Sequence, residues 1–115
     1  MNSIELKPKS VFDHFARINA IPRPSKREEK MIAYLKEWGE SHGLDTRVDK
    51  VGNVIIRKPA TPGYEDRKTV ILQSHFDMVC DKLVDVEFDF DRDAIQTYVD
   101  GEWLKASGNT LSADD

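Results

Sequence analysis

The sequence predicts an α/β fold in which helices pack on a mixed β-sheet. Three observations support this class: two stretches with apolar residues at helical spacing, two hairpin patterns, and an apolar run without alternation at Val70, Ile71 and Leu72. Such a run is typical of a strand that is buried on both faces. Because two amphipathic helices can cover only part of that strand, we also expect the domain to be incomplete.

The composition predicts one soluble globular domain at most. The chain has 115 residues, of which 39% are hydrophobic and 33% charged, with a net charge of -4. This charge argues against nucleic acid or an anionic membrane as a partner. The sequence contains no apolar run of 18 residues and no secretory leader pattern, so we expect a cytoplasmic protein. Cys80 is the sole cysteine, which excludes an internal disulfide and a cysteine-built zinc site.

The first predicted helix begins after Ser10, which is a candidate N-cap, and ends at about Asn19. Its apolar stripe consists of Val11, Phe12, Phe15 and Ile18. His14 lies off this stripe, so we interpret it as a solvated surface residue. Two prolines in residues 21–24 then interrupt the helical pattern.

The second predicted helix opens with Ser25 and Glu28, which match the S-x-x-E pattern of a capping box. Gly43 supplies the stop signal. The apolar stripe between them, which should pack on the sheet, consists of Met31, Ile32, Leu35 and Trp38.

Two hairpins are predicted. Residues 46–50 and 53–57 form the first, around Val51 and Gly52, and residues 95–99 and 102–105 form the second. The Asp100-Gly101 pair between the latter two strands favours a type I′ turn. Residues 59–67 are a loop by their prolines and glycine, and residues 78–94 show no helical pattern.

The candidate functional residues follow the buried run directly. His75 and Asp77 are two apart, so on a strand their side chains would emerge on the same side at its carboxyl end. A catalytic metal ion is often held by a neutral imidazole whose ring is oriented by a neighbouring carboxylate. The pair therefore indicates a metal site, although a His-x-Asp triplet is a weak signal by itself.

An acidic run offers an alternative metal site. Asp89, Asp91 and Asp93 copy the first three ligand spacings of a calcium-binding EF-hand loop. Ala94 then stands where glycine is needed and Asp100 where a bidentate glutamate is needed. We therefore prefer an extended, half-exposed segment here.

Several stretches together resemble one family, the aminoacyl-histidine dipeptidases (Xaa-His dipeptidases), which are dinuclear zinc exopeptidases. The matching stretches are residues 21–25 (Ile-Pro-Arg-Pro-Ser), 51–60, 70–79, 100–106 and 108–115 (Gly-Asn-Thr-Leu-Ser-Ala-Asp-Asp). His-x-Asp is shared by the wider family of zinc exopeptidases and acyl-amino-acid deacylases. The Gly-Glu-Trp hairpin followed by Thr-Leu-Ser-Ala-Asp narrows the resemblance to the dipeptidase branch.

The resemblance implies a role for each of three residues. His75 would ligate one zinc ion, Asp77 would orient that histidine, and Asp114 would bridge two zinc ions. Asp115 departs from the pattern, since this branch commonly has asparagine there. The family's general base, one of a pair of glutamates, and the remaining ligands lie further along the family's chain and have no match here.

The resemblance also implies that residues 1–115 are the amino-terminal portion of a zinc-exopeptidase catalytic domain, without the remaining catalytic and lid domains. The substrate would be a small peptide, and the complete enzyme could be a homodimer. Two alternatives stay open. One is a related amidohydrolase or deacylase of the same superfamily, and the other is a non-catalytic fragment or interaction module. In every case we expect this chain alone to be inactive.

Overall fold

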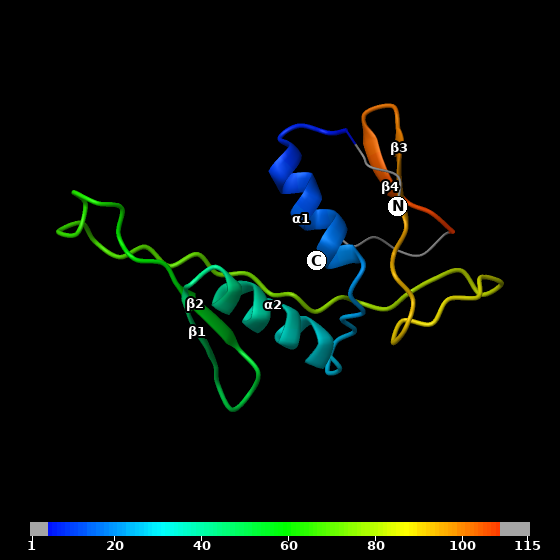
Figure 1. Cartoon of the computed structure of the whole chain (residues 1–115). Coiled ribbons are helices and arrows are strands. Elements are labelled where there is room, and N and C mark those ends of the chain that lie inside the picture. The colour runs from blue at the N-terminus through cyan, green and yellow to red at the C-terminus, as the bar shows by residue number, and fades with distance from the viewer. Residues whose placement is uncertain (1–4, 109–115) are drawn as a thin grey trace. The chain divides into compact units, whose positions relative to one another are not determined.

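The computed structural model describes residues 5–108, which fall into two compact units (Figure 1). The first unit comprises Met1–Met31 and Phe76–Asp115, and the second comprises Ile32–His75. The first unit therefore combines two separate segments of chain, whereas the second is continuous. Helices and antiparallel strands are both present, which confirms the α/β class.

Helix α1 spans Lys9–Asn19 and ends where the sequence predicted. The predicted cap is wrong, because Pro8 occupies the N-cap position and Ser10 lies inside the first turn. Proline presets the extended geometry from which a helix can start, and it makes no side-chain cap bond. The exposed Lys9 and Asp13, whose Nζ and Oδ2 atoms are 2.5 Å apart, support the first turn instead.

Helix α2 spans Glu29–Ser41. Its predicted apolar stripe is confirmed, since Met31 is buried and Ile32, Leu35 and Trp38 are half-buried. Gly43 follows the helix with a φ of 69°, a left-handed conformation that glycine adopts without a steric penalty. The predicted stop signal is therefore confirmed.

The first hairpin belongs to the second unit. Strands β1 (Asp45–Val48) and β2 (Val54–Arg57) pair antiparallel, with Val48 opposite Val54. Helix α2 lies alongside this hairpin (Figure 1). The approach is close at Gly39, where an added Cβ would lie 2.1 Å from the Oγ1 atom of Thr46. The helix therefore approaches the hairpin at Gly39, and the packing of the stripe residues Leu35 and Trp38 on a sheet stays a prediction.

The second hairpin belongs to the first unit. Strands β3 (Thr97–Asp100) and β4 (Trp103–Ala106) pair antiparallel, with Asp100 opposite Trp103. The two-residue loop is therefore Gly101 and Glu102, one position later than predicted. Only Gly101 in this loop has a positive φ, at 61°, which is the pattern of a type II′ turn rather than type I′.

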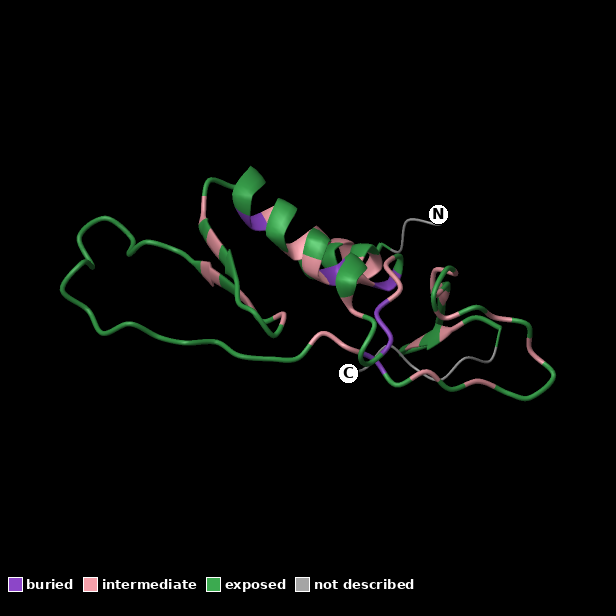
Figure 2. Ribbon diagram, turned by 90° about the horizontal axis from the view of Figure 1, so that it is seen from below, coloured by how far each residue is buried: buried purple, intermediate pink, exposed green. Residues whose placement is uncertain are grey.

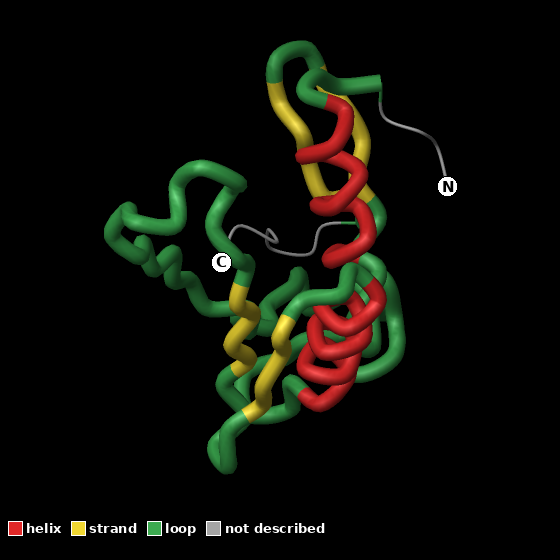
Figure 3. Tube along the Cα trace, turned by 60° about the vertical axis from the view of Figure 1, so that its left-hand side comes forward, coloured by secondary structure: helices red, strands yellow, loops and turns green. Residues whose placement is uncertain are grey.

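The predicted central strand is not formed. Residues 69–77 adopt neither helix nor strand, and the side chains of Val70, Ile71 and Leu72 are 77%, 85% and 93% exposed. Figure 2 shows most of this long connection after β2 as exposed, and Figure 3 shows it as a loop. A strand exists only when another strand pairs with it, and within residues 5–108 the sheets are the two separate hairpins. The described part of the chain therefore forms no mixed sheet.

The two remaining connections agree with the predictions of a loop at residues 59–67 and of no helix at residues 78–94. Residues 59–67 contain turns but neither helix nor strand, and residues 78–94 contain no helix. Within residues 5–108, neither helix is long and apolar enough to cross a membrane.

Candidate functional site

The structure describes two of the three predicted site residues. His75 is exposed and lies in the loop after β2, so its predicted place at the end of a strand is wrong. Asp77 is half-buried and precedes the buried Met78. Asp114 and Asp115 lie outside the described residues.

The backbone around Asp77 is held by the Ile-Pro-Arg-Pro-Ser stretch. The amide of Met78 donates to the carbonyl of Arg23 (2.9 Å), and the amide of Ser25 donates to the carbonyl of Met78 (3.2 Å). Pro24 and Met78 thereby form a parallel β-bridge. Proline suits the middle position because it has no N–H group that would need a partner.

Two side chains of the same stretch reinforce this contact. Arg23 is only 2% exposed, and its Nη1 atom donates to the carbonyl of Phe76 at 3.1 Å. The hydroxyl of Ser25 donates to Oδ2 of Asp77 at 2.6 Å, a length typical of a charge-assisted hydrogen bond. A longer contact of 3.4 Å joins the same hydroxyl to the carbonyl of Met78. We call residues 23–25 with these contacts the Arg-Pro-Ser clamp.

The role of Ser25 differs from its predicted role as a helix cap. Helix α2 begins four residues later, at Glu29, and the hydroxyl of Ser25 bonds to Asp77. Glu28 accepts a hydrogen bond from the backbone amide of Lys26 (2.6 Å), so the reciprocal capping box is absent here. Lys26 has a φ of 70°, which turns the chain between the clamp and the helix.

Sequence reasoning therefore missed Ser25 and Arg23 as neighbours of Asp77. The S-x-x-E pattern gave Ser25 a local explanation, whereas its partner is 52 positions away. The signal that could have found both was the resemblance itself, because residues 21–25 and 70–79 are both among its matching stretches.

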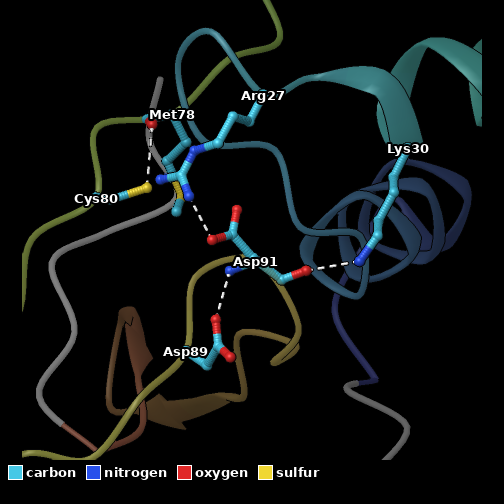
Figure 4. Close-up of polar contacts among 6 residues, drawn as sticks. All are labelled: Arg27, Lys30, Met78, Cys80, Asp89 and Asp91. Carbon is cyan, nitrogen blue, oxygen red and sulfur yellow. Dashed lines mark hydrogen bonds and ion pairs between the residues drawn. The ribbon is translucent and has the colours of Figure 1, made fainter.

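A second polar cluster contains Arg27 and Lys30, which follow the clamp in the sequence (Figure 4). Arg27 forms an ion pair with Asp91, and Nζ of Lys30 donates to the backbone carbonyl of Asp91 at 2.6 Å. The amide of Asp91 donates to the side chain of Asp89 (3.0 Å). Residues 90–92 form a turn, in which the amides of Arg92 and Asp93 donate to the carbonyl of Asp89, so the extended segment that we preferred is wrong at this position.

Cys80 behaves as a structural thiol. Burial raises the pKa of the Cys80 thiol, and Asp91 adds to this shift, whereas Arg27 opposes it. Its Sγ atom lies 3.7 Å from the carbonyl of Met78 (Figure 4). A raised pKa keeps the sulfur protonated, which is the opposite of what a nucleophile needs.

The donor types at the candidate site suit zinc, which binds imidazole nitrogen and carboxylate oxygen. Their number is smaller than a zinc site requires, because catalytic zinc typically has three protein ligands. Within residues 5–108, no three histidine, cysteine, aspartate or glutamate side chains are grouped so that they could hold a metal ion. The metal-site role of His75 and Asp77 stays a prediction.

The chain shares this fold with dipeptidases. It superposes on the crystal structure of the aminoacylhistidine dipeptidase from Vibrio alginolyticus with a TM-score of 0.90 and 49% sequence identity. This match covers 96% of the chain but 22% of the Vibrio protein.

The chain is also similar in sequence to the cytosol non-specific dipeptidase of Escherichia coli strain K12. The two sequences are 50% identical over 110 residues, which is 96% of this chain and 23% of the relative. The chain thus spans less than a quarter of the length of the relatives that it matches. No family model matches it. Over nearly the whole chain, the resemblance to aminoacyl-histidine dipeptidases is confirmed.

Proposed function

We propose that this chain is the metal-binding, amino-terminal part of a cytoplasmic dipeptidase catalytic domain that hydrolyses Xaa-His and related dipeptides. The observation that carries this proposal is the 49–50% identity to two dipeptidases over 96% of the chain. His75 and Asp77 fall within that match as a residue pair with suitable metal-site chemistry.

We assign each residue one role in that reaction. His75 presents a neutral imidazole nitrogen as a ligand, and Asp114 supplies a carboxylate that can bridge two ions. Asp77 orients the ring of His75. When bound, zinc polarises the scissile carbonyl and lowers the pKa of a water molecule. Proton transfer to the leaving amine needs a general base that we place outside these 115 residues.

The breadth of the substrate class is a separate part of the proposal. The name of the Escherichia coli relative describes a non-specific dipeptidase, and that of the Vibrio relative an aminoacylhistidine dipeptidase. We propose small dipeptides as substrates, with histidine at the carboxyl end as one accepted residue among others. We do not favour the deacylase alternative, because both of these relatives are named as dipeptidases.

The test is a chimera in which this sequence replaces the matching 110 residues of the Escherichia coli dipeptidase. We expect the chimera to hydrolyse Xaa-His dipeptides and to lose this activity when zinc is removed. His75→Ala should abolish zinc-dependent turnover, whereas His14→Ala, an exposed histidine on α1, should leave it unchanged.

Three results decide the matter. A folded chimera that does not bind zinc, or one whose turnover survives His75→Ala, would contradict the assignment of His75. A chimera that prefers acyl-amino acids over dipeptides would favour the deacylase alternative. The isolated 115-residue chain should hydrolyse neither substrate, because it lacks the proposed base.

A further inference from the structure

We propose that Ser25 is a positioning residue that fixes the carboxylate of Asp77 in one orientation, and that the Arg-Pro-Ser clamp exists to hold Asp77. The inference deepens the proposed function, in which Asp77 orients His75, and it rests on that function. It concerns how the orienting carboxylate is itself held.

The first step is the backbone on both sides of Asp77. The carbonyl of Phe76 accepts from the buried guanidinium of Arg23, and the amide of Met78 donates to the carbonyl of Arg23. Met78 is only 4% exposed, so its side chain anchors the same place. The backbone before and after Asp77 is therefore fixed to a single short stretch of chain.

The second step is the side chain of Asp77. Its carboxylate could still rotate about two bonds with the backbone fixed. The 2.6 Å bond from the Ser25 hydroxyl commits Oδ2 to one direction. A hydrogen bond to a charged acceptor is roughly twice as strong as one between neutral groups, so it is strong enough to select a rotamer. In the proposed site, Oδ1 would be the oxygen that accepts from the imidazole N–H group of His75.

The third step is that the serine hydroxyl has no competing task in the helix. Helix α2 begins at Glu29, and the acceptor for the nearby amide of Lys26 is Glu28. Removal of the hydroxyl should therefore leave the helix intact. A purely structural serine would instead affect the fold.

The first experiment measures the rotamer of Asp77 in the isolated chain without metal. Three-bond scalar couplings about the Cα–Cβ bond of Asp77 report by NMR whether one rotamer is populated. We expect one rotamer in the wild-type chain, averaged couplings in Ser25→Ala, and restored couplings in Ser25→Thr. Ser41→Ala is the matched control, because its hydroxyl donates to the carbonyl of Trp38 in the other unit.

The thermal melts of the variants separate positioning from folding. Ser25→Ala should still unfold in one cooperative transition, with at most a small decrease in melting temperature because Ser25 is exposed. Averaged couplings in the wild-type chain, or a single rotamer that persists in Ser25→Ala, would overturn the inference. So would a Ser25→Ala variant whose lost rotamer is explained by an unfolded chain.

The second experiment titrates the active chimera described above with zinc. Loss of a residue that supports a metal ligand typically lowers metal affinity by about 10- to 100-fold. We expect Ser25→Ala to weaken zinc binding by about tenfold, at the low end of that range because Ser25 acts through Asp77. Ser25→Thr should restore the affinity. Equal affinity in Ser25→Ala and the wild type would overturn the link to the metal.

The two experiments fail in different ways. If His75→Ala leaves zinc binding and turnover unchanged, the proposed function is wrong, while the NMR couplings still decide whether Ser25 fixes Asp77. If His75→Ala abolishes binding but Ser25→Ala changes neither couplings nor affinity, the proposed function stands and the role of Ser25 is wrong.

Discussion

At the scale of single residues, Arg23 shows how a charged side chain becomes part of the fold. Its guanidinium is buried, and burial of a charge is costly unless hydrogen bonds compensate for it. The carbonyl of Phe76 supplies one such bond, and the backbone of Arg23 holds Met78 at the same time. Arg23 thus joins two parts of the first unit that are more than fifty positions apart in the sequence.

We predict that Arg23→Ala destabilises the first unit. The change removes a charge-assisted bond and leaves the Phe76 carbonyl without that donor, a loss of about 1.5–3 kcal/mol in the free energy of unfolding. Arg23→Lys should restore only part of it, because an ammonium group lacks the planar fork of guanidinium. Urea denaturation followed by circular dichroism measures both values.

Arg17→Ala, at an exposed position in the last turn of α1, is the control. An equal effect from both alanine variants would show that the clamp contributes nothing to stability.

A second residue-scale prediction concerns pH. A side-chain hydrogen bond from Asn53, followed by bonds from backbone amides, lowers the pKa of Asp49 below its usual 3.8. A group with a lowered folded-state pKa stabilises the fold above its unfolded pKa, and this contribution is lost as the pH falls through the folded value. The amides of Val51 and Asn53, which both donate to Oδ1 of Asp49, should therefore change their NMR shifts with a titration midpoint below the usual aspartate pKa of 3.8.

The control for this titration is Asn53→Ala, which removes the largest cause of the shift. Asp49 should then titrate closer to its usual pKa, and the amide of Val51 should respond at a higher pH. Identical titration midpoints in the variant and the wild type would show that Asn53 does not hold this carboxylate.

At the scale of elements, sequence patterns predicted the features that depend on interactions between neighbouring residues, namely the hairpins and the apolar stripe of α2. Both hairpins form within one residue of their predicted turns, because a glycine with positive φ is encoded where it acts. The apolar stripe of α2 is equally local. The starts of both helices were predicted wrongly, since Ser10 and Ser25 match a cap pattern that the chain does not use.

The candidate site divides in the same way. His75 and Asp77 were predicted from their spacing and the resemblance, whereas Ser25 and Arg23 were not, because their partners are distant in sequence. A short sequence pattern cannot show that a serine hydroxyl will bond to a carboxylate that is far away in the sequence. Only the folded structure shows it.

An element-scale prediction follows from the contact between α2 and β1. Gly39→Ala should gain about 1 kcal/mol of helix propensity. The new Cβ would lie 2.1 Å from Oγ1 of Thr46 and 3.1 Å from its Cβ and Cγ2 atoms. Overpacking of this kind costs about 1–3 kcal/mol, so the net effect should be destabilising by up to about 2 kcal/mol.

A double-mutant cycle tests the cause of that loss. In a Thr46→Ala background the clashing oxygen and methyl group are gone, so Gly39→Ala should become neutral or stabilising. The free energy of unfolding of the four proteins gives the coupling directly. Additive effects of the two changes would mean that the helix and the hairpin do not meet at this position.

At the scale of the whole molecule, the apolar run at residues 70–72 shows that a strand-like sequence does not form a strand by itself. The composition of residues 70–72 predicts a buried strand, but a strand also needs a partner to accept its backbone hydrogen bonds. Each of the two described sheets consists of one two-stranded hairpin, and neither pairs with this run. The relatives have chains more than four times as long as the matched part, which covers 22–23% of each.

We therefore predict that the isolated chain self-associates through residues 69–74. This six-residue window contains no charge, proline or glycine, and it combines high β-propensity with exposed apolar side chains. An exposed segment of this kind is a template for pairing with another chain.

Ile71→Lys places a charge in the centre of this segment, which should oppose such pairing and increase the monomer fraction measured by sedimentation velocity. Val51→Lys adds the same charge at a 76% exposed position in the turn after β1 and should leave the association unchanged. If both lysine variants raise the monomer fraction equally, net charge rather than the apolar run controls association; if neither does, the exposed run is not the contact.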